Sequence, residues 1–128
     1  NGLGYPDKDF FIYADDLAYT KGLKHLGQDL VFVPELVFLH DQERKNKRSL
    51  LPLWRIFYYI RNNLIFYKSI SGNLFYFVAS YKLLVWFFKF RRYGLNLRFY
   101  RVLFRAFSDV LSGNLKRSHA EVIKLSNK

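Results

Sequence analysis

The sequence predicts a mixed α/β chain in which helices predominate, and three observations support this prediction. Short apolar runs in the first 40 residues are typical of strands. Longer stretches rich in apolar and aromatic residues fill most of the rest, are separated at Gly72, Gly94 and Gly113, and are expected to be helices. Finally, 51% of the 128 residues are hydrophobic and 20% are aromatic, which is enough for one core.

The N-terminal elements follow from local signals. Residues Phe10–Tyr13 are expected to form a short buried strand or the start of a buried segment. Asp15 or Asp16 can cap a helix that Gly27 ends. Two further strand-like runs, Leu30–Val33 and Leu36–Leu39, lie on either side of a proline.

The polar stretch "QERKNKRS" at 42–49 is predicted to be a linker, which divides the chain into segments 1–45 and 46–128. The second segment should be helical. Its helices are expected at roughly 50–70, 73–92, 95–112 and 116–125.

Charge is distributed unevenly between the two segments. Residues 1–43 hold three Lys against eight acids, a balance of −5, whereas residues 44–128 hold eighteen Lys or Arg against two acids, a balance of +16. An acidic head and a basic, aromatic tail indicate two roles. The absence of Cys excludes disulfide scaffolds and thiolate metal sites. Because the chain opens on Asn1 without a signal peptide, we expect a cytoplasmic piece of a longer protein.

The basic tail has two interpretations. Its most apolar run, Leu74–Phe88, contains Lys82 and falls short of the roughly 20 apolar residues that span a membrane. Cations such as Arg98, beside aromatics such as Trp86 and Phe87, fit a helix lying in an anionic membrane surface. Alternatively, the aromatics form an ordinary core and the cations a solvated face.

Polar residues that could carry chemistry stand at three places. Asp15 and Asp16 could simply open a helix, or one of them could act as a general base at the end of a strand. His40 could be structural or could ligate a divalent metal. Arg61 and Asn62 could lie on a solvated helix face or contact phosphate or sugar hydroxyls.

Several stretches taken together resemble the C-terminal part of a family 2 glycosyltransferase of the galactofuranosyl- and rhamnosyltransferase-like branch. They are, in order, "GYPDKDFFIYADDLAYTKGLKHLG", "VFVPELVFLH", "YYIRNN" and "RAFSDVLSGNLKR". The last is similar to the family's "A-x-x-D-G-L-x-G-x-x-G". The chain departs from the family's pattern at Ala18 and Gly22, and the nucleotide-binding half with its Asp-x-Asp would lie upstream.

The resemblance implies a fold and a set of roles. Residues 1–45 would be the last segment of a GT-A (Rossmann-like) catalytic domain, and 46–128 a basic, aromatic helical extension. Asp16 matches the family's general base and Asp15 its acceptor-positioning partner. His40 matches a histidine of the metal shell, which implies Mg²⁺ or Mn²⁺. The pair Arg61 and Asn62 matches the family's "R-N", expected here to contact the donor.

The implied activity is an inverting hexosyl transfer of galactofuranose or rhamnose type. The donor would be a nucleotide sugar, and the acceptor a surface glycan or a lipid-linked glycan. The enzyme would lie on the inner face of the plasma membrane, bound to anionic lipid, and the fragment alone should be inactive. The rival function is a non-catalytic basic helical module that binds anionic membrane or nucleic acid. No nucleic-acid reader motif is present, so we expect no nucleic-acid partner.

Overall fold

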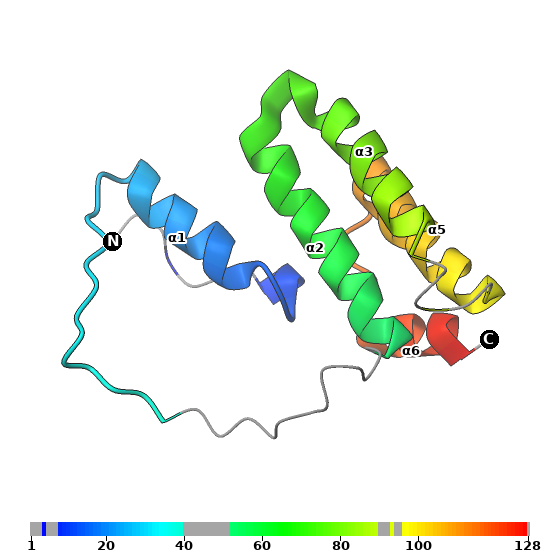
Figure 1. The fold of residues 1–128 in the computed structure, drawn as a ribbon, viewed down its shortest axis with the longest axis horizontal. Helices are drawn as coiled ribbons and strands as arrows, with labels where there is room; N and C mark the ends of the chain where they lie inside the picture. The colour runs from blue at the N-terminus through cyan, green and yellow to red at the C-terminus, as the bar shows by residue number, and fades with distance from the viewer. Residues whose placement is uncertain (1–3, 5–7, 40–51, 90–92, 94–95, 128) are drawn as a thin grey trace.

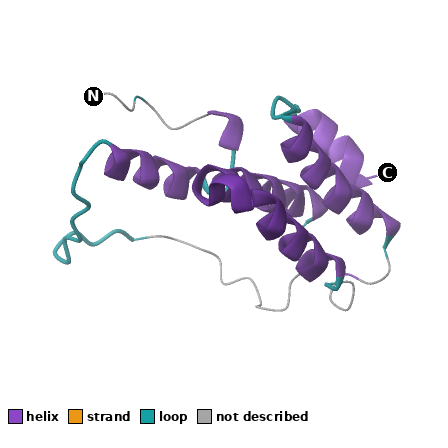
Figure 2. Ribbon diagram, turned by 90° about the horizontal axis from the view of Figure 1, so that it is seen from above, coloured by secondary structure: helices purple, strands orange, loops and turns teal. Residues whose placement is uncertain are grey.

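The structure, a computed structural model, describes residues 4, 8–39, 52–89, 93 and 96–127 (Figure 1). Within these ranges every regular element is a helix and no strand is present (Figure 2). The α-helices are α1 (Asp15–His25), α2 (Leu53–Ser71), α3 (Phe75–Phe87), α5 (Leu97–Ser112) and α6 (His119–Asn127). Two short 3₁₀ turns, η1 (Lys8–Phe10) and η2 (Gly72–Leu74), complete the list. The predominance of helix is therefore confirmed.

Helices α2, α3, α5 and α6 form a small helical domain. α2 packs mainly against α5, and α6 lies across one end of α2 (Figure 1). The core consists of apolar side chains that recur at helical spacing on the facing sides. Those fully enclosed are Ile56, Phe57, Phe99, Val102, Leu103, Ala106 and Val122. The four helices predicted for the second segment thus exist, each within a few residues of its expected limits or shorter.

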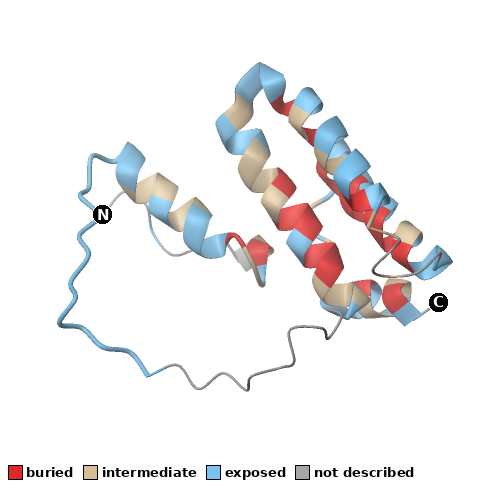
Figure 3. Ribbon diagram, in the orientation of Figure 1, coloured by how far each residue is buried: buried red, intermediate tan, exposed pale blue. Residues whose placement is uncertain are grey.

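The strand predictions for residues 10–13 and 30–39 are wrong, whereas the alternative for 10–13, the start of a buried segment, fits Phe10, which is buried. Residues 30–39 form an extended, irregular segment whose eight large apolar side chains are 42% to 98% exposed (Figure 3). An apolar run of this kind is typical of a strand covered on both faces. A strand also needs neighbours for its backbone hydrogen bonds, and the described residues supply none.

Helix α1 ends as predicted but begins differently. Gly27 adopts φ +71°, its N–H donates to the Lys24 carbonyl (3.1 Å), and the Gln28 N–H donates to the Leu23 carbonyl (3.0 Å). These two bonds form a Schellman motif. At the other end, the cap position is occupied by Ala14 and no side chain caps the helix, so the prediction that an aspartate does so is wrong. Instead, the acid pair occupies the first turn.

Gly72 turns the chain between α2 and α3. With φ +51° and ψ −127°, it interrupts a helical stretch, Leu53–Phe87, that is long and apolar enough to cross a membrane by length and composition alone. Figure 1 shows α2 and α3 folded back on each other as a hairpin. Neither half is a simple lipid-exposed rod, because the inner side of each helix contributes to the shared core.

The inner side of α3 also corrects one detail of the membrane interpretation. Trp86, expected at the membrane, is only 8% exposed and packs edge-on against Tyr59, with ring centroids 5.8 Å apart. Lys89 lies over the Trp86 ring at 3.6 Å, and Lys82 lies over Tyr67 at 4.7 Å. The Lys82–Tyr67 contact therefore stabilises the packing of α3 on α2 through a cation–π interaction, whereas the Lys89–Trp86 contact lies at the C-terminal end of α3.

Candidate functional site

Asn62 of α2 holds the segment that precedes the acid pair. Its side chain is fully buried, and Nδ2 donates to the carbonyls of Phe10 (2.5 Å), Ile12 (2.6 Å) and Tyr13 (3.2 Å). The carbonyl of Phe10 also accepts the Ile12 N–H within the same turn. A single amide group thus fixes the backbone path of a segment about 50 residues earlier in the chain.

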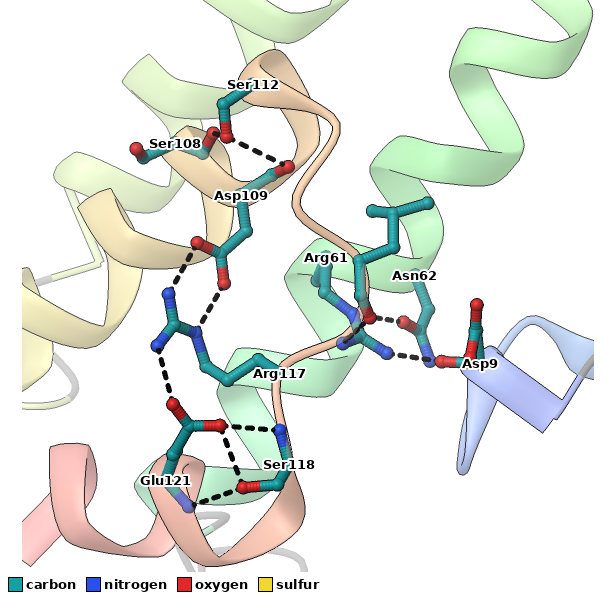
Figure 4. Close-up of polar contacts among 10 residues, drawn as sticks. Asp9, Arg61, Asn62, Ser108, Asp109, Ser112, Arg117, Ser118 and Glu121 are labelled. Atoms are coloured by element: carbon teal, nitrogen blue, oxygen red, sulfur yellow. Dashed lines mark hydrogen bonds and ion pairs between the residues drawn. The ribbon is translucent and has the colours of Figure 1, made fainter.

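Arg61, the neighbouring residue, joins three stretches of the chain. Its Nε donates to Asn62 Oδ1 (2.9 Å), Nη2 to the Asp9 carbonyl (2.5 Å) and Nη1 to the Leu115 carbonyl (3.3 Å). Figure 4 shows the guanidinium lying beside Asn62 and pointing toward Asp9. We call these two side chains the Arg61–Asn62 clamp.

Burial shapes the electrostatics of the clamp. It lowers the pKa of Arg61 from its ordinary value, and the neighbouring Tyr58 and Asp109 offset part of this effect. Burial raises the pKa of Tyr58, whose hydroxyl lies 3.3 Å from His119 Nδ1. The positive charge stays at the centre of the site because guanidinium remains protonated in proteins. Carbonyl oxygens are its hydrogen-bond acceptors.

Aromatic contacts reinforce the attachment of the segment. Phe11 lies against Tyr58, with ring centroids 5.0 Å apart, and Tyr13 meets Tyr59 edge-on at 5.5 Å. Further along α1, Lys21 Nζ donates to the Ser69 carbonyl and hydroxyl. The two adjacent tyrosines of "YYIRNN", Tyr58 and Tyr59, therefore pack against Phe11 and Tyr13 of "FFIY".

The backbone in front of the acid pair is strained. Phe11, Tyr13 and Ala14 have φ values of +44°, +69° and +60°, a region that side chains with a Cβ rarely adopt. Such conformations persist where surrounding contacts fix them, and they gather at functional sites. The clamp supplies those contacts. Asp15 and Asp16 follow at once, and both are exposed.

A buried ion pair fixes the other side of the site. Asp109 of α5, 2% exposed, accepts from Arg117 Nε (2.6 Å) and Nη2 (2.9 Å) in a bidentate pair. This pair, drawn in Figure 4, closes the loop between α5 and α6. The loop turns at Gly113 (φ +73°) and carries the Leu115 carbonyl. The hydrogen bond to Asp109 is the main reason the pKa of Arg117 is raised.

An open pocket of about 440 Å³ lies beside the clamp. Its walls carry both charged and aromatic groups. They are Asp9, Phe11, Tyr58, Arg61, Leu115, Lys116, Arg117 and His119. Aromatic faces next to several N–H donors are typical of sites that bind ligands with a ring and polar groups. Whether Arg61 and Asn62 also contact a donor substrate stays a prediction.

The predicted metal site lies mostly outside this geometry. His40 is not among the described residues, so its role stays a prediction. In the ranges that the structure describes, no group of three or more His, Asp or Glu side chains could hold a metal ion. The residues described do not by themselves fit Mg²⁺ or Mn²⁺, which prefer several oxygen ligands.

Two features of the site were missed by sequence reasoning. The Asp109–Arg117 pair has no recognisable spacing, because its partners lie on a helix and a following loop. The start of α6 did have a signal. "SHAE" at 118–121 is a capping box: Ser118 N–H donates to Glu121 Oε2 (2.8 Å), and Glu121 N–H donates to Ser118 Oγ (3.3 Å).

Comparison of the chain with family models, curated proteins and solved structures found no match of significance in any of the three.

Proposed function

We propose that this chain is the C-terminal part of an inverting family 2 glycosyltransferase of galactofuranosyl or rhamnosyl type. The observation that carries the proposal is the Arg61–Asn62 clamp. It joins "FFIYADD", "YYIRNN" and "DVLSGNLKR", three stretches on which the family resemblance rests, around two side chains. These stretches lie far apart in the sequence, and their meeting at two side chains supports the proposal that they form one site.

The proposed chemistry begins at Asp16. Its carboxylate is exposed on the first turn of α1, so a sugar hydroxyl can approach it. Asp16 takes the hydroxyl proton as the acceptor oxygen bonds to the anomeric carbon of the donor. The bond from that carbon to the nucleotide diphosphate breaks at the same time, which inverts the configuration. Asp15 positions the acceptor.

The clamp has a positioning role in this proposal. It fixes the carbonyls of residues 9–13, and a general base must stay within hydrogen-bond reach of the proton that it removes. The nucleotide-binding half, and the metal-binding residues that would act with His40, would come from upstream sequence. The exposed apolar segment at 30–39 fits the same proposal, since upstream strands could cover both of its faces.

The test is the Asp16→Asn variant of the full-length enzyme. Turnover should fall by a factor of about 10²–10⁴, as expected for loss of a general base, while nucleotide-sugar binding changes little. Asp15→Asn should chiefly raise the KM for the acceptor. Asp29→Asn, an exposed acid in the loop after α1, is the matched control and should retain activity. Wild-type turnover in Asp16→Asn would refute the assignment of the base.

One observation favours the rival function, an anionic-surface module. Residues 53–108 contain ten Lys or Arg and no Asp or Glu. The two functions are compatible, because catalysis is assigned to α1 and this charge lies on the helical domain.

A further inference from the structure

Apart from Ser80 and Lys82, helix α3 consists of apolar and aromatic residues, yet only one side of it is covered. Phe75, Ala79 and Trp86 face the core. Five large side chains at alternating spacings of three and four residues form a row on the uncovered side, the first and last of them directly before and after the helix. They are Leu74, Phe77, Tyr81, Leu84 and Phe88, and we call them the outer stripe. A helix that is apolar all round is normally buried on all sides.

The exposure of the outer stripe is large and continuous. Each of its five side chains is 58% to 77% exposed, and Tyr76 beside them is similarly open. Figure 3 shows α3 banded with exposed positions along its length. Scattered single apolar residues on a surface are ordinary, but a contiguous apolar row marks a docking surface.

Charge identifies the partner. The 56 residues from 53 to 108 contain ten cations and no acid. Arg98, Arg101 and Arg105 are exposed on α5, the helix that packs beside α3. An apolar stripe within a uniformly basic surface complements a layer that is apolar inside and anionic outside. A second copy of this basic domain would instead bring like charges together.

The length of α3 sets how it can bind. Its 13 residues extend about 20 Å, whereas the hydrocarbon core of a bilayer is about 30 Å thick. The turn at Gly72 directs the chain back along α2, which is packed into the protein core. Helix α3 can therefore lie in the membrane surface with one side inserted, but it cannot span the bilayer.

From this arrangement we infer that the outer stripe of α3 inserts into the interfacial layer of an anionic membrane, with the exposed arginines of α5 contacting lipid phosphates. This surface is separate from the acid pair and does not depend on glycosyl transfer. The residues that insert are those of the outer stripe and not Trp86, whose side chain is buried in the core.

The experiment uses the 128-residue chain and sedimentation with vesicles of phosphatidylcholine, alone or with one third phosphatidylglycerol. The wild-type chain should bind the anionic vesicles. The double variant Phe77→Gln/Leu84→Gln should bind at least tenfold more weakly, even at high salt, where the apolar contribution remains. The matched control is Phe32→Gln/Phe38→Gln, which removes two aromatics that are more exposed than Phe77 and Leu84. It should bind as wild type, because these aromatics lie in the acidic N-terminal part, which an anionic surface repels.

A labelling measurement locates the contact directly. Because the chain has no Cys, Ser80→Cys provides a single attachment point for an environment-sensitive dye beside the outer stripe without altering it. The dye should enter an apolar environment when anionic vesicles are added. The same dye at Lys124→Cys, on the exposed side of α6, should stay in water.

Charge reversal tests the second half of the inference. Arg98→Glu/Arg101→Glu/Arg105→Glu should release most of the protein at low salt while circular dichroism shows an intact helical fold. Binding of the wild type to neither vesicle, unchanged binding of the Phe77/Leu84 variant, or concentration-dependent dimerisation through the stripe would each overturn the proposal. Tighter binding to single-stranded nucleic acid than to anionic vesicles would do so as well.

Discussion

Residues 30–39 are more apolar than helices α2 and α5, yet their apolar side chains are exposed whereas those of the two helices form the core. In α2 and α5, apolar residues recur at helical spacing, so one side of each helix meets the other and forms a core. In residues 30–39 they follow one another directly on both sides of Pro34, and the described residues bury none of them. The difference shows that apolar side chains are buried within a chain only when another element of that chain presents an apolar face with the same periodicity.

The Arg61–Asn62 clamp connects these two parts of the molecule. Its bonds are made by side chains of the helical domain and received by backbone carbonyls of the N-terminal part. Because the helical domain buries its own apolar side chains and residues 30–39 do not, we expect the domain to be stable by itself and the N-terminal part to depend on it. Three variants separate these dependencies.

The largest effect should come from Asp109→Asn, which acts on the helical domain itself. The variant leaves Arg117, whose side chain is only 15% exposed, without its bidentate partner. Removing one member of a buried pair costs about 3 kcal/mol or more. Urea unfolding followed by circular dichroism should show this loss. Ser108→Ala, at the exposed neighbouring position, is the control and should be close to neutral. An equally small loss for both variants would mean that the pair contributes little.

A smaller loss of stability, with a different signature, is expected for Asn62→Ala. The variant removes all the hydrogen bonds from Asn62 to the segment before the acid pair, and we expect about 2 kcal/mol of lost stability. Chymotrypsin should then cut near Phe11 and Tyr13 much faster, while the helical domain stays resistant. Asn63→Ala, which loses only a bond to the Tyr59 carbonyl within the same helix, is the matched control. Equal cleavage of both variants would show that the clamp does not hold the segment.

The smallest effect concerns the start of α6 and depends on pH. Hydrogen bonds from Ser118 lower the pKa of Glu121 below its ordinary value of 4.5. The ionised form is therefore favoured in the folded state, so its contribution is present above the ordinary pKa and disappears as the pH falls through the lowered one. Thermal unfolding of the wild type should thus lose stability on acidification, and Glu121→Gln should lose less.

Ser118→Ala provides the reference for this measurement. It removes the cap at every pH and should cost about 1 kcal/mol at neutral pH. Neither variant should alter proteolysis near Phe11, since the capping box lies within the helical domain. If the stability of Glu121→Gln depended on pH as that of the wild type does, Glu121 would not contribute to the loss of stability in acid.

The helices could be predicted from the sequence because their signals are local. Glycines that separate apolar stretches identified the limits of α2 and α5. Gly27 and Gly113 end α1 and α5 in the left-handed conformation that glycine adopts readily. The strand predictions failed because a strand depends on neighbours that its own residues do not specify. A helix, in contrast, satisfies most of its backbone hydrogen bonds internally.

The candidate site could be predicted only in part. Asp15 and Asp16 were found as a pair at the start of a helix, where the structure places them. Arg61 and Asn62 were also singled out, but their hydrogen bonds to the carbonyls of Asp9 and Phe10 were not foreseen. A carbonyl belongs to every residue type, so a side chain that recognises the backbone leaves no complementary partner in the sequence.

Because the clamp binds backbone carbonyls and not side chains, it has an evolutionary consequence. The clamp fixes the path of residues 9–13 through carbonyl oxygens, which survive any substitution. Mutations there can change the side chains in front of the acid pair at the cost of their aromatic and core contacts, while the hydrogen bonds to the main chain remain. Selection can thus explore new surfaces at this position without rebuilding the scaffold, provided that Arg61 and Asn62 are retained.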